Sequence, residues 1–392
     1  MANSILTPTM VTRKALMILH QKLNFVGSIN RQYDDQFAKK GAKIGSTLSI
    51  RLPNQYTVRT GATLSTQDTT ESSVSLAVST QKGVDLNFTS ADLTMALDDF
   101  SERILDPAMA VLAANIEADA MSMATSVYNT VDNHGTALTM AKMLNARKIL
   151  MDNLAPTDKR TANLNTQDNV DLVNANKGLF QDATNIAKQY KEGYMGRTAG
   201  FDFVENTLWP GFTPGAQNGA YVTNGAGQTG ASLIVKTGTG AMVVGDVFTI
   251  AGVYRVHPES KQSTGILQQF VVTAAYAGGG GTIAISPSIV ATGATQNVSA
   301  TPGDAAALTF VGAASTATGQ SLAYHEDAFT FATADLIMPN GVDFAHRDVL
   351  DGISMRIVRA YDINNDKFPC RLDVLYGYKA IRPQLAVRLL NN

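Results

Sequence analysis

Apolar and polar residues alternate in two short runs near the beginning of the chain. Residues 47–52 and residues 73–79 each carry an apolar side chain at every second position. This is the period of a half-buried β-strand. About twenty mostly polar residues, 53–72, separate the two runs. The pattern predicts a long two-stranded arm. Because an isolated hairpin is marginal in water, we expect the arm to lie on another surface, and a neighbouring subunit is one candidate.

Helical periodicity is strongest after Pro107. Seven apolar residues recur there at steps of three or four, which is one stripe of an α-helix; they are Leu105, Met109, Leu112, Ile116, Ala120, Met123 and Val127. We interpret the methionines as core filling rather than as a cofactor site. Residues 10–24 can form a short amphipathic helix. Thr89 and Asp92 have the spacing of a capping box, which predicts a helix start at Thr89.

A second helical segment covers residues 140–154, and short helices and strands are expected to alternate over 137–215. The expected inward positions of the 140–154 helix are Met140, Met143, Leu144 and Ile149.

The pattern changes between residues 215 and 318, which are rich in Gly, Thr, Ala and Val. Turn signals separate short strand-like runs; these are residues 233–235, 247–250, 270–274, 282–285 and 308–311. They predict a small all-β barrel or sandwich. Because mixed structure resumes at Leu322, we expect this region to be inserted into an α+β chain.

Composition and charge restrict the classes of function that the chain can have. Only 16% of the 392 residues are charged, and the net charge is −2. Typical soluble domains carry roughly 25% charged residues, so much of this surface is weakly polar and can be covered by neighbours at small desolvation cost. No cluster of Lys and Arg predicts tight nucleic-acid binding. The single cysteine, Cys370, excludes an internal disulfide.

Nothing in the first residues has the form of a signal peptide, and no segment reaches the roughly 20 apolar residues of a membrane span. We therefore expect a cytoplasmic protein without a membrane partner.

Two motifs suggest ligands but lack the required context. Gly225 to Gly230 match the dinucleotide pattern GxGxxG, yet a probable strand follows where a helix N-terminus is needed. Asp362, Asn364 and Asp366 occupy the first three ligand positions of a calcium loop, but Lys367 stands where the loop requires glycine. A polar β-turn is the favoured interpretation.

The remaining candidate chemistry is weaker. No two histidines among His20, His134, His257, His325 and His346 have metal-ligand spacing, although His325 with Glu326 and Asp327 could in principle bind a cation. Cys370 alternates with apolar residues and is interpreted as a buried small hydrophobe. We predict no catalytic residue, no cofactor and no metal site, and therefore no enzyme.

Several segments in chain order resemble one protein family. They include QKGVDLNFTSADL at 81–93, DDFSERILDP at 98–107 and the C-terminal run at 355–389; the others are 43–48, 56–59, 196–203, 250–254, 262–265, 268–272 and 325–329. Together they resemble the major coat proteins of tailed double-stranded DNA phages, in the branch typified by Salmonella phage P22.

The resemblance implies an α+β Hong Kong 97-type capsid fold with an inserted small all-β domain. The implied segments are an N-terminal arm (1–40), an extended loop hairpin (41–88), a peripheral domain with a long spine helix (89–136), a first part of the axial domain (137–215), the inserted β-domain (216–322) and the return strands of the axial and peripheral domains (323–392). Salt-bridged contacts of the inserted domain are in doubt here, because the segment has few charges.

The implied function is a major capsid protein of the virion. Copies would assemble as pentamers and hexamers into an icosahedral shell around double-stranded DNA, contacted non-specifically, in the host cytoplasm. No charged amphipathic assembly segment precedes the arm, so a separate scaffolding protein is expected, as well as a portal.

Gly83 and Gly352 are candidate hinges by residue type. The open alternatives are a cellular nanocompartment shell that packages protein cargo, a secreted adhesin and, most distant, an enzyme.

Overall fold

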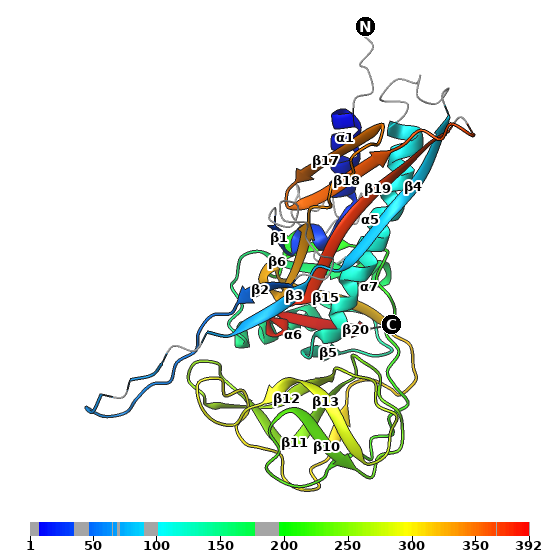
Figure 1. Cartoon of the computed structure of the whole chain (residues 1–392). Coiled ribbons are helices and arrows are strands. Elements are labelled where there is room, and N and C mark those ends of the chain that lie inside the picture. Colours follow the sequence, from blue (N-terminus) through cyan, green and yellow to red (C-terminus); the bar gives the residue numbers. More distant parts are fainter. Residues whose placement is uncertain are drawn as a thin grey trace. The chain divides into compact units, whose positions relative to one another are not determined.

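The computed structural model describes residues 8–34, 47–64, 66–68, 71–89, 101–176, 196–365 and 367–391 (Figure 1). Helices and strands are mixed, as expected of an α+β protein. The chain divides into two compact units, which are described separately. Unit 1 comprises Met1–Arg51, Ser73–Met121 and Phe329–Ile381; unit 2 comprises Leu52–Ser72, Ser122–Ala328 and Arg382–Asn392.

Unit 1 is built on one mixed sheet. Its strands run in the order β1 (Asn30–Asp34), β16 (Phe329–Ala334), β19 (Lys367–Ala380), β18 (Ile353–Arg359) and β17 (Phe344–Leu350), with β4 (Thr80–Thr89) also paired to β19. Among the described residues of this unit the α-helices are α1 (Pro8–Lys22), α2 (Phe25–Ser28) and α5 (Asp106–Met121), the last preceded by a π-helical turn, η2 (Ser101–Leu105). A buried carboxylate joins two of them, because Glu117 of α5 accepts the backbone N–H groups of Phe25 and Val26 at the start of α2.

The predicted stripe along α5 is confirmed. All seven residues from Leu105 to Val127 in that stripe are at most 4% exposed. Pro107 lies in the first turn of the helix, where its missing N–H costs nothing. The α-helix ends at Met121, and the chain continues as a 3₁₀ helix, η3 (Ser122–Ser126). The periodic pattern therefore located the helix but overestimated its α-helical length.

The predicted arm is divided between a supported base and an exposed loop. Its strands are β2 (Thr47–Arg51) and β3 (Ser73–Ala77), paired in register from Thr47 with Ala77 to Arg51 with Ser73. Apolar residues of the base pack with Ala332, Ala334 and Leu375 of the unit 1 sheet. The base of the arm therefore lies on another surface, as expected, and for the base that surface is the sheet of its own chain.

Sequence reasoning missed the longest strand pairing in unit 1. β4 pairs antiparallel with β19 over ten residue pairs, from Thr80 with Tyr376 to Thr89 with Lys367. Thr89 ends this strand, and residues 90–92 of the predicted helix start lie outside the described residues. At Gly83 an added Cβ would approach the Leu372 carbonyl oxygen to 2.5 Å, so the close strand contact requires glycine there.

Unit 2 contains a second six-stranded sheet flanked by helices. Its strands run in the order β5 (Thr130–Asp132), β20 (Ala386–Asn391), β15 (Gly319–His325), β6 (Arg160–Leu164), β8 (Phe201–Glu205) and β7 (Arg197–Thr198). The helices among the described residues of this unit are η3, α6 (Met140–Asp152), α7 (Thr166–Asn176), η4 (Glu326–Ala328) and η5 (Pro383–Leu385). The described residues contain no helix long and apolar enough to cross a membrane.

The inward face of α6 differs from the prediction. Met143, Ala146 and Leu150 are buried, whereas Leu144 is 46% exposed. The expected assignment of Leu144 to the core was therefore wrong. Ala146, although small, occupies the position between Met143 and Leu150 that faces the sheet, so helical spacing and not side-chain size decided the buried face.

Residues 222–310 form a sheet of their own in unit 2. Its order is β14 (Leu308–Phe310), β11 (Val247–Val256), β12 (Ser263–Val272), β13 (Gly281–Ile289), β10 (Gly230–Lys236) and β9 (Val222–Thr223). Backbone hydrogen bonds from Leu308 to Tyr221 and from Thr223 to Ala306 link its two ends, so the sheet closes into a small barrel. Fourteen buried hydrophobic residues fill it.

All five predicted strand-like runs of this region overlap strands of the barrel. That the barrel is a separate inserted domain bounded near residues 216 and 322 stays a prediction, because the contacts group it with the rest of unit 2.

Candidate functional site

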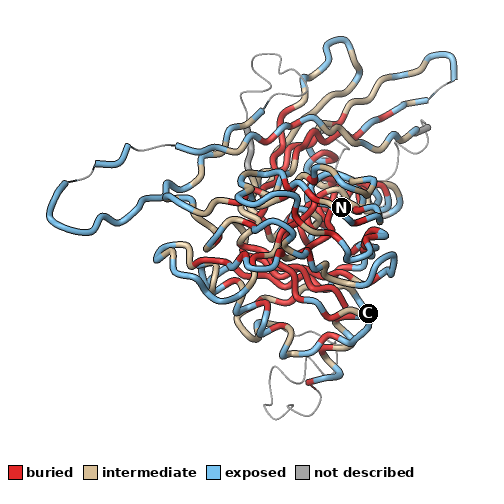
Figure 2. The backbone as a smooth tube through the Cα atoms, turned by 90° about the horizontal axis from the view of Figure 1, so that it is seen from below, coloured by how far each residue is buried: buried red, intermediate tan, exposed pale blue. Residues whose placement is uncertain are grey.

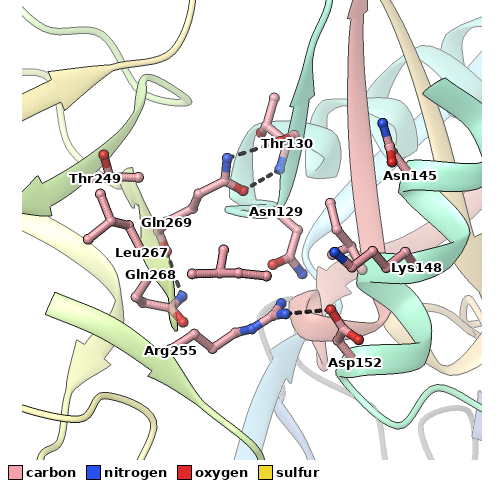
Figure 3. Close-up of a pocket in the computed structure, with 12 residues that line it drawn as sticks. Asn129, Thr130, Asn145, Lys148, Asp152, Thr249, Arg255, Leu267, Gln268 and Gln269 are labelled. Atoms are coloured by element: carbon pink, nitrogen blue, oxygen red, sulfur yellow. Dashed lines mark hydrogen bonds and ion pairs between the residues drawn. The ribbon is translucent and has the colours of Figure 1, made fainter. Parts of the chain in front are cut away.

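A cleft of about 400 Å³ lies within unit 2, between helix α6 and strands β11 and β12 of the barrel (Figure 3). We call it the α6 cleft; twelve residues line it: Asn129, Thr130, Asn145, Lys148, Ile149, Asp152, Thr249, Arg255, Ile266, Leu267, Gln268 and Gln269. Its volume is in the range of small-molecule sites, roughly 300–1,000 Å³. Isoleucine and leucine side chains supply the apolar part of the wall, and amide and charged groups supply the rest.

A side-chain amide fixes one side of the α6 cleft. Gln269 Oε1 accepts the Thr130 backbone N–H at 2.8 Å, and Gln269 Nε2 donates to the Thr130 carbonyl oxygen at 3.0 Å. The amide thus makes the same pair of bonds as a neighbouring strand would on the free edge of β5. This contact anchors β12 of the barrel to the second sheet of unit 2.

An ion pair fixes the other side of the α6 cleft. Arg255 Nη2 lies 2.8 Å from Asp152 Oδ2 at the end of α6. Arg255 is only 9% exposed, and its Nε has no hydrogen-bond partner among the described residues. Figure 3 shows Lys148 and Asp152 on α6 facing Gln268 and Arg255 across the opening. The cleft therefore holds two cations and one carboxylate.

A buried arginine joins the barrel to the C-terminal strand. Arg388 of β20 is 0% exposed and donates to the Gly245 carbonyl oxygen at 2.6 Å and to Gln320 Oε1 at 3.0 Å. Its guanidinium carbon lies 4.4 Å from the centre of the Phe212 ring. Burial lowers the pKa of Arg388 to about 10, against the opposing charge of Asp246, so the group stays protonated at neutral pH.

A carboxyl group is buried where α7 meets strands β15 and β20. Asp168 Oδ2 accepts hydrogen bonds from Ser321 Oγ and from Asn391 Nδ2, while its Oδ1 has no partner among the described residues. Burial raises the pKa of Asp168 above its ordinary range. These hydrogen bonds tie α7 to strands β15 and β20, so the cluster has the character of a structural junction.

Unit 1 buries a carboxylate against two arginines. Asp373 of β19 is 1% exposed; Arg356 Nη2 and Arg371 Nε each lie within 2.8 Å of its Oδ2. Burial raises the pKa of Asp373, but the hydrogen bonds and charges of the two guanidinium groups outweigh it, so the pKa lies below its usual value.

In the same unit Tyr376 of β19 donates to Asp119 of α5, which also pairs with Lys82 of β4.

The loop between β2 and β3 is the second candidate surface. Every described residue from 53 to 72 is exposed, as Figure 2 shows along the tube. Thr57 and Gln67 bind each other across the loop, with the Thr57 N–H donating to Gln67 Oε1 at 2.8 Å. Three apolar side chains of the loop, Tyr56, Val58 and Leu64, are mostly uncovered, with exposures of 57%, 93% and 77%. The apolar surface that remains exposed on the loop is available for contact with another molecule.

The two sequence motifs lie in local structures that differ from those of the usual ligand sites. Gly230 begins strand β10 and not a helix, and the Gly225 N–H donates to the carboxylate of Asp304. Asp362 caps a turn between β18 and β19 by accepting the Asn364 N–H. Asp366 of that motif lies outside the described residues.

The histidines and the cysteine do not come together. Among the described residues no group of three His, Cys, Asp or Glu side chains could hold a metal ion. His325 is buried, its Nδ1 accepts the Asp327 N–H, and burial lowers its pKa. Burial raises the pKa of Cys370 to about 12, which leaves the thiol protonated and unreactive at neutral pH.

The candidate hinges differ from each other. Gly83 is held by the close approach of β19, whereas Gly352 has φ +77° in the turn between β17 and β18. Beside it Asp351, with φ 50°, accepts a hydrogen bond from His20 and pairs with Arg31.

Arg255 and Arg388 were missed by sequence reasoning, because no local spacing distinguishes a buried arginine in a strand from an exposed one.

Comparisons with known proteins point to one family. The family model described as "P22 coat protein - gene protein 5" matches residues 30–390. No curated protein matches the chain. A structure from Mycobacterium phage Che8 is similar at 13% identity and TM-score 0.46, covering 94% of this chain and 90% of that one. The CUS-3 coat protein I-domain is 30% identical over 24% of this chain and 96% of its own, with TM-score 0.19.

A virus-like particle from Pyrococcus furiosus is 6% identical with TM-score 0.36, covering 97% and 98% of the two chains. All three TM-scores are below 0.5, so the assignment rests on the family model.

Proposed function

Since the chain belongs to the P22 coat protein family and is a major capsid protein of a tailed bacteriophage, we propose that it assembles as pentamers and hexamers around double-stranded DNA. Its fold is the Hong Kong 97-type capsid fold. Proteins of this family are structural, and we propose that this one has no catalytic activity. The nanocompartment alternative is the weaker one, because the matching family model is that of a phage coat protein.

The loop of residues 52–72 carries the proposal for assembly. Its three apolar side chains, Tyr56, Val58 and Leu64, are more than half exposed, while its internal Thr57–Gln67 bonds hold the loop in shape. A preformed loop loses less conformational entropy when it docks than a disordered one. We infer that it lies on an adjacent subunit, and a modest contact of this kind is sufficient when it is repeated around a closed shell.

The other segments receive roles on the same basis. The helix α5 serves as the spine of a peripheral domain, residues 137–215 form the first part of an axial domain, the return strands of residues 323–392 are shared between these two domains, and the barrel is the inserted domain. We propose further that a separate scaffolding protein guides closure in the host cytoplasm, that a portal completes the shell and that DNA is contacted without sequence preference. A net charge of −2 supports weak rather than tight contact with DNA.

Electron microscopy of the protein expressed with and without its genetic neighbours tests these proposals. We expect closed particles of one size with the neighbours and irregular or no shells without them. Uniform native-sized shells from the purified chain alone would remove the scaffolding protein from the proposal. Monomers and small oligomers under both conditions would contradict shell assembly itself.

A further inference from the structure

The α6 cleft contains polar groups that its own chain leaves without partners. Arg255 Nε and Thr130 Oγ1 are buried and have no hydrogen-bond partner among the described residues. Arg255 is 9% exposed and Thr130 is 4% exposed. Buried donors and acceptors of proteins are normally satisfied, so unpaired ones in the wall of a cleft indicate a place for a further molecule. Neither group is required by the assembly contacts proposed above.

The charge in the α6 cleft favours an anion. Lys148 and Arg255 contribute two positive charges, and Asp152, which is paired with Arg255, contributes one negative charge. Lys148 has no ion-pair partner in the described parts of the chain. The guanidinium group of Arg255 still has a donor to offer after its bond to Asp152, and a planar donor group suits a carboxylate.

The apolar part of the α6 cleft restricts the anion further. Ile149, Ile266 and Leu267 line it beside the amides of Gln268 and Asn145. A bare inorganic anion would leave these apolar side chains in contact with water. A carboxylate on an aliphatic stem would cover them and place its charge near the cations, while the amides could bind a neighbouring peptide group.

We propose that the α6 cleft is a binding site for a carboxylate carried on a short apolar stem. Two sources share this chemistry: a small aliphatic acid, and the C-terminal carboxylate of a peptide that ends in an aliphatic residue. The site joins α6 to barrel strands β11 and β12, so an occupant strengthens the link that Arg255–Asp152 and Gln269–Thr130 already make.

Calorimetric titration of the full chain in dilute solution tests the proposal with N-acetyl-L-leucine as the probe. We expect saturable binding with a dissociation constant on the order of 1 mM, the range expected for a ligand of this size. N-acetyl-L-leucine amide keeps the stem and lacks the charge, and acetate keeps the charge and lacks the stem. Both are expected to bind at least about 10-fold more weakly.

Variants locate the binding. Lys148→Gln removes an exposed cation of the cleft and is expected to weaken binding about 10-fold. Arg147→Gln is the matched control, because Arg147 is exposed on the same helix and does not line the cleft. The dissociation constant of this variant for N-acetyl-L-leucine should change less than about 2-fold. Arg255→Lys keeps the charge near Asp152 but removes the planar donor group, and we expect about 5-fold weaker binding.

Absence of saturable binding up to roughly 20 mM, far above the expected constant, would overturn the proposal. Equal binding of the neutral amide, or an identical loss in Arg147→Gln and Lys148→Gln, would do so as well. The source is decided by two further ligands. Hexanoate binding as tightly as the probe indicates a small acid, whereas tighter binding of longer peptides that end in leucine indicates a chain terminus.

Discussion

Asp373 in unit 1 and Arg388 in unit 2 are both almost fully buried charges, at 1% and 0% exposed. Asp373 is bound by two arginines of opposite charge, from β18 and from its own strand. Arg388 is bound by a backbone carbonyl, a side-chain amide and an aromatic ring, all neutral. The difference shows in the pKa of each group: Asp373 is held more firmly in its charged form than in water, and Arg388 less firmly.

This contrast has a consequence for mutation. Removing one member of a buried ion pair leaves the other charge without a partner. Removing a buried charge whose hydrogen bonds go to neutral groups leaves polar atoms without a partner, which costs less per group. For Arg388 it also removes the electrostatic attraction to Asp246, which is not hydrogen-bonded to it. The substitutions below test this difference from the largest expected effect on stability to the smallest.

Asp373→Asn should have the largest effect. Two guanidinium groups lose their carboxylate, and breaking a buried pair in this way costs about 3–5 kcal/mol. Urea unfolding of the unassembled subunit at pH 7 measures the loss. Asp343→Asn is the control: Asp343 pairs with Arg359 and is 43% exposed in its side chain, so that change should cost less than about 1 kcal/mol. Equal losses in the two variants would contradict the contrast.

The same carboxylate predicts a pH dependence. Because the folded-state pKa of Asp373 lies below its ordinary value, its contribution to stability is complete above the unfolded-state pKa of about 3.9. The contribution is lost as the pH falls below that value through the folded-state pKa. Stability measured between neutral pH and this acidic range should fall less steeply in Asp373→Asn than in the unchanged protein. Parallel curves would show that other groups determine the acid sensitivity.

Arg388→Met should have the next largest effect. Methionine fills much of the same volume, but the Gly245 carbonyl oxygen and Gln320 Oε1 lose their donors. At about 1–3 kcal/mol for a buried group left unpaired, we expect a loss of about 2–3 kcal/mol. Arg388→Lys retains a donor and the charge and should lose less. A loss in Arg388→Met larger than in Asp373→Asn would reverse the comparison.

Gly83→Ala tests the strand pairing that surrounds Asp373. An added Cβ would lie 2.5 Å from both Asp373 Oδ1 and the Leu372 carbonyl oxygen, so β4 and β19 must separate locally. Overpacking of this kind costs about 1–3 kcal/mol. Gly303→Ala is the control, because nothing lies within 4 Å of its added Cβ. The measurement is the thermal unfolding temperature of the two variants. Equal unfolding temperatures would show that β4 can move away from β19 at no cost, which is what the hinge hypothesis for Gly83 requires.

Val58→Ser with Leu64→Ser should have the smallest effect on the subunit. These side chains are 93% and 77% exposed, so the change in stability should stay within about 0.5 kcal/mol. The yield of closed particles should nevertheless fall when the protein is expressed with its genetic neighbours. Thr60→Ser, in the same exposed loop, should leave the yield unchanged. Normal particle yield in the double variant would remove the loop from the assembly contacts.

Elements defined by local periodicity were predicted well from the sequence. The stripe from Leu105 to Val127 is buried as expected, because seven residues at helical spacing need no distant partner to define a face. The barrel strands were also located, since turn residues separate them along the chain. The assignment of Leu144 to the inward face was wrong, because its angular position on α6 places it outward.

Elements defined by a distant partner were not predicted. Strand β4 carries Lys82, Asp85 and Asn87 among its apolar residues, and it is recognisable as a strand only through its ten pairs with β19. The α6 cleft combines residues of α6, β5, β11 and β12, and no spacing within one segment indicates them.

The sequence by itself determined the helix faces, the positions of the barrel strands and, through ordered short segments, the resemblance to phage coat proteins. Only the tertiary structure decided which charges are buried and what holds them. The physical reason is that hydrophobic periodicity is a property of neighbouring residues, whereas the cost of burying Asp373, Arg388 or Arg255 depends on groups that folding brings from elsewhere in the chain.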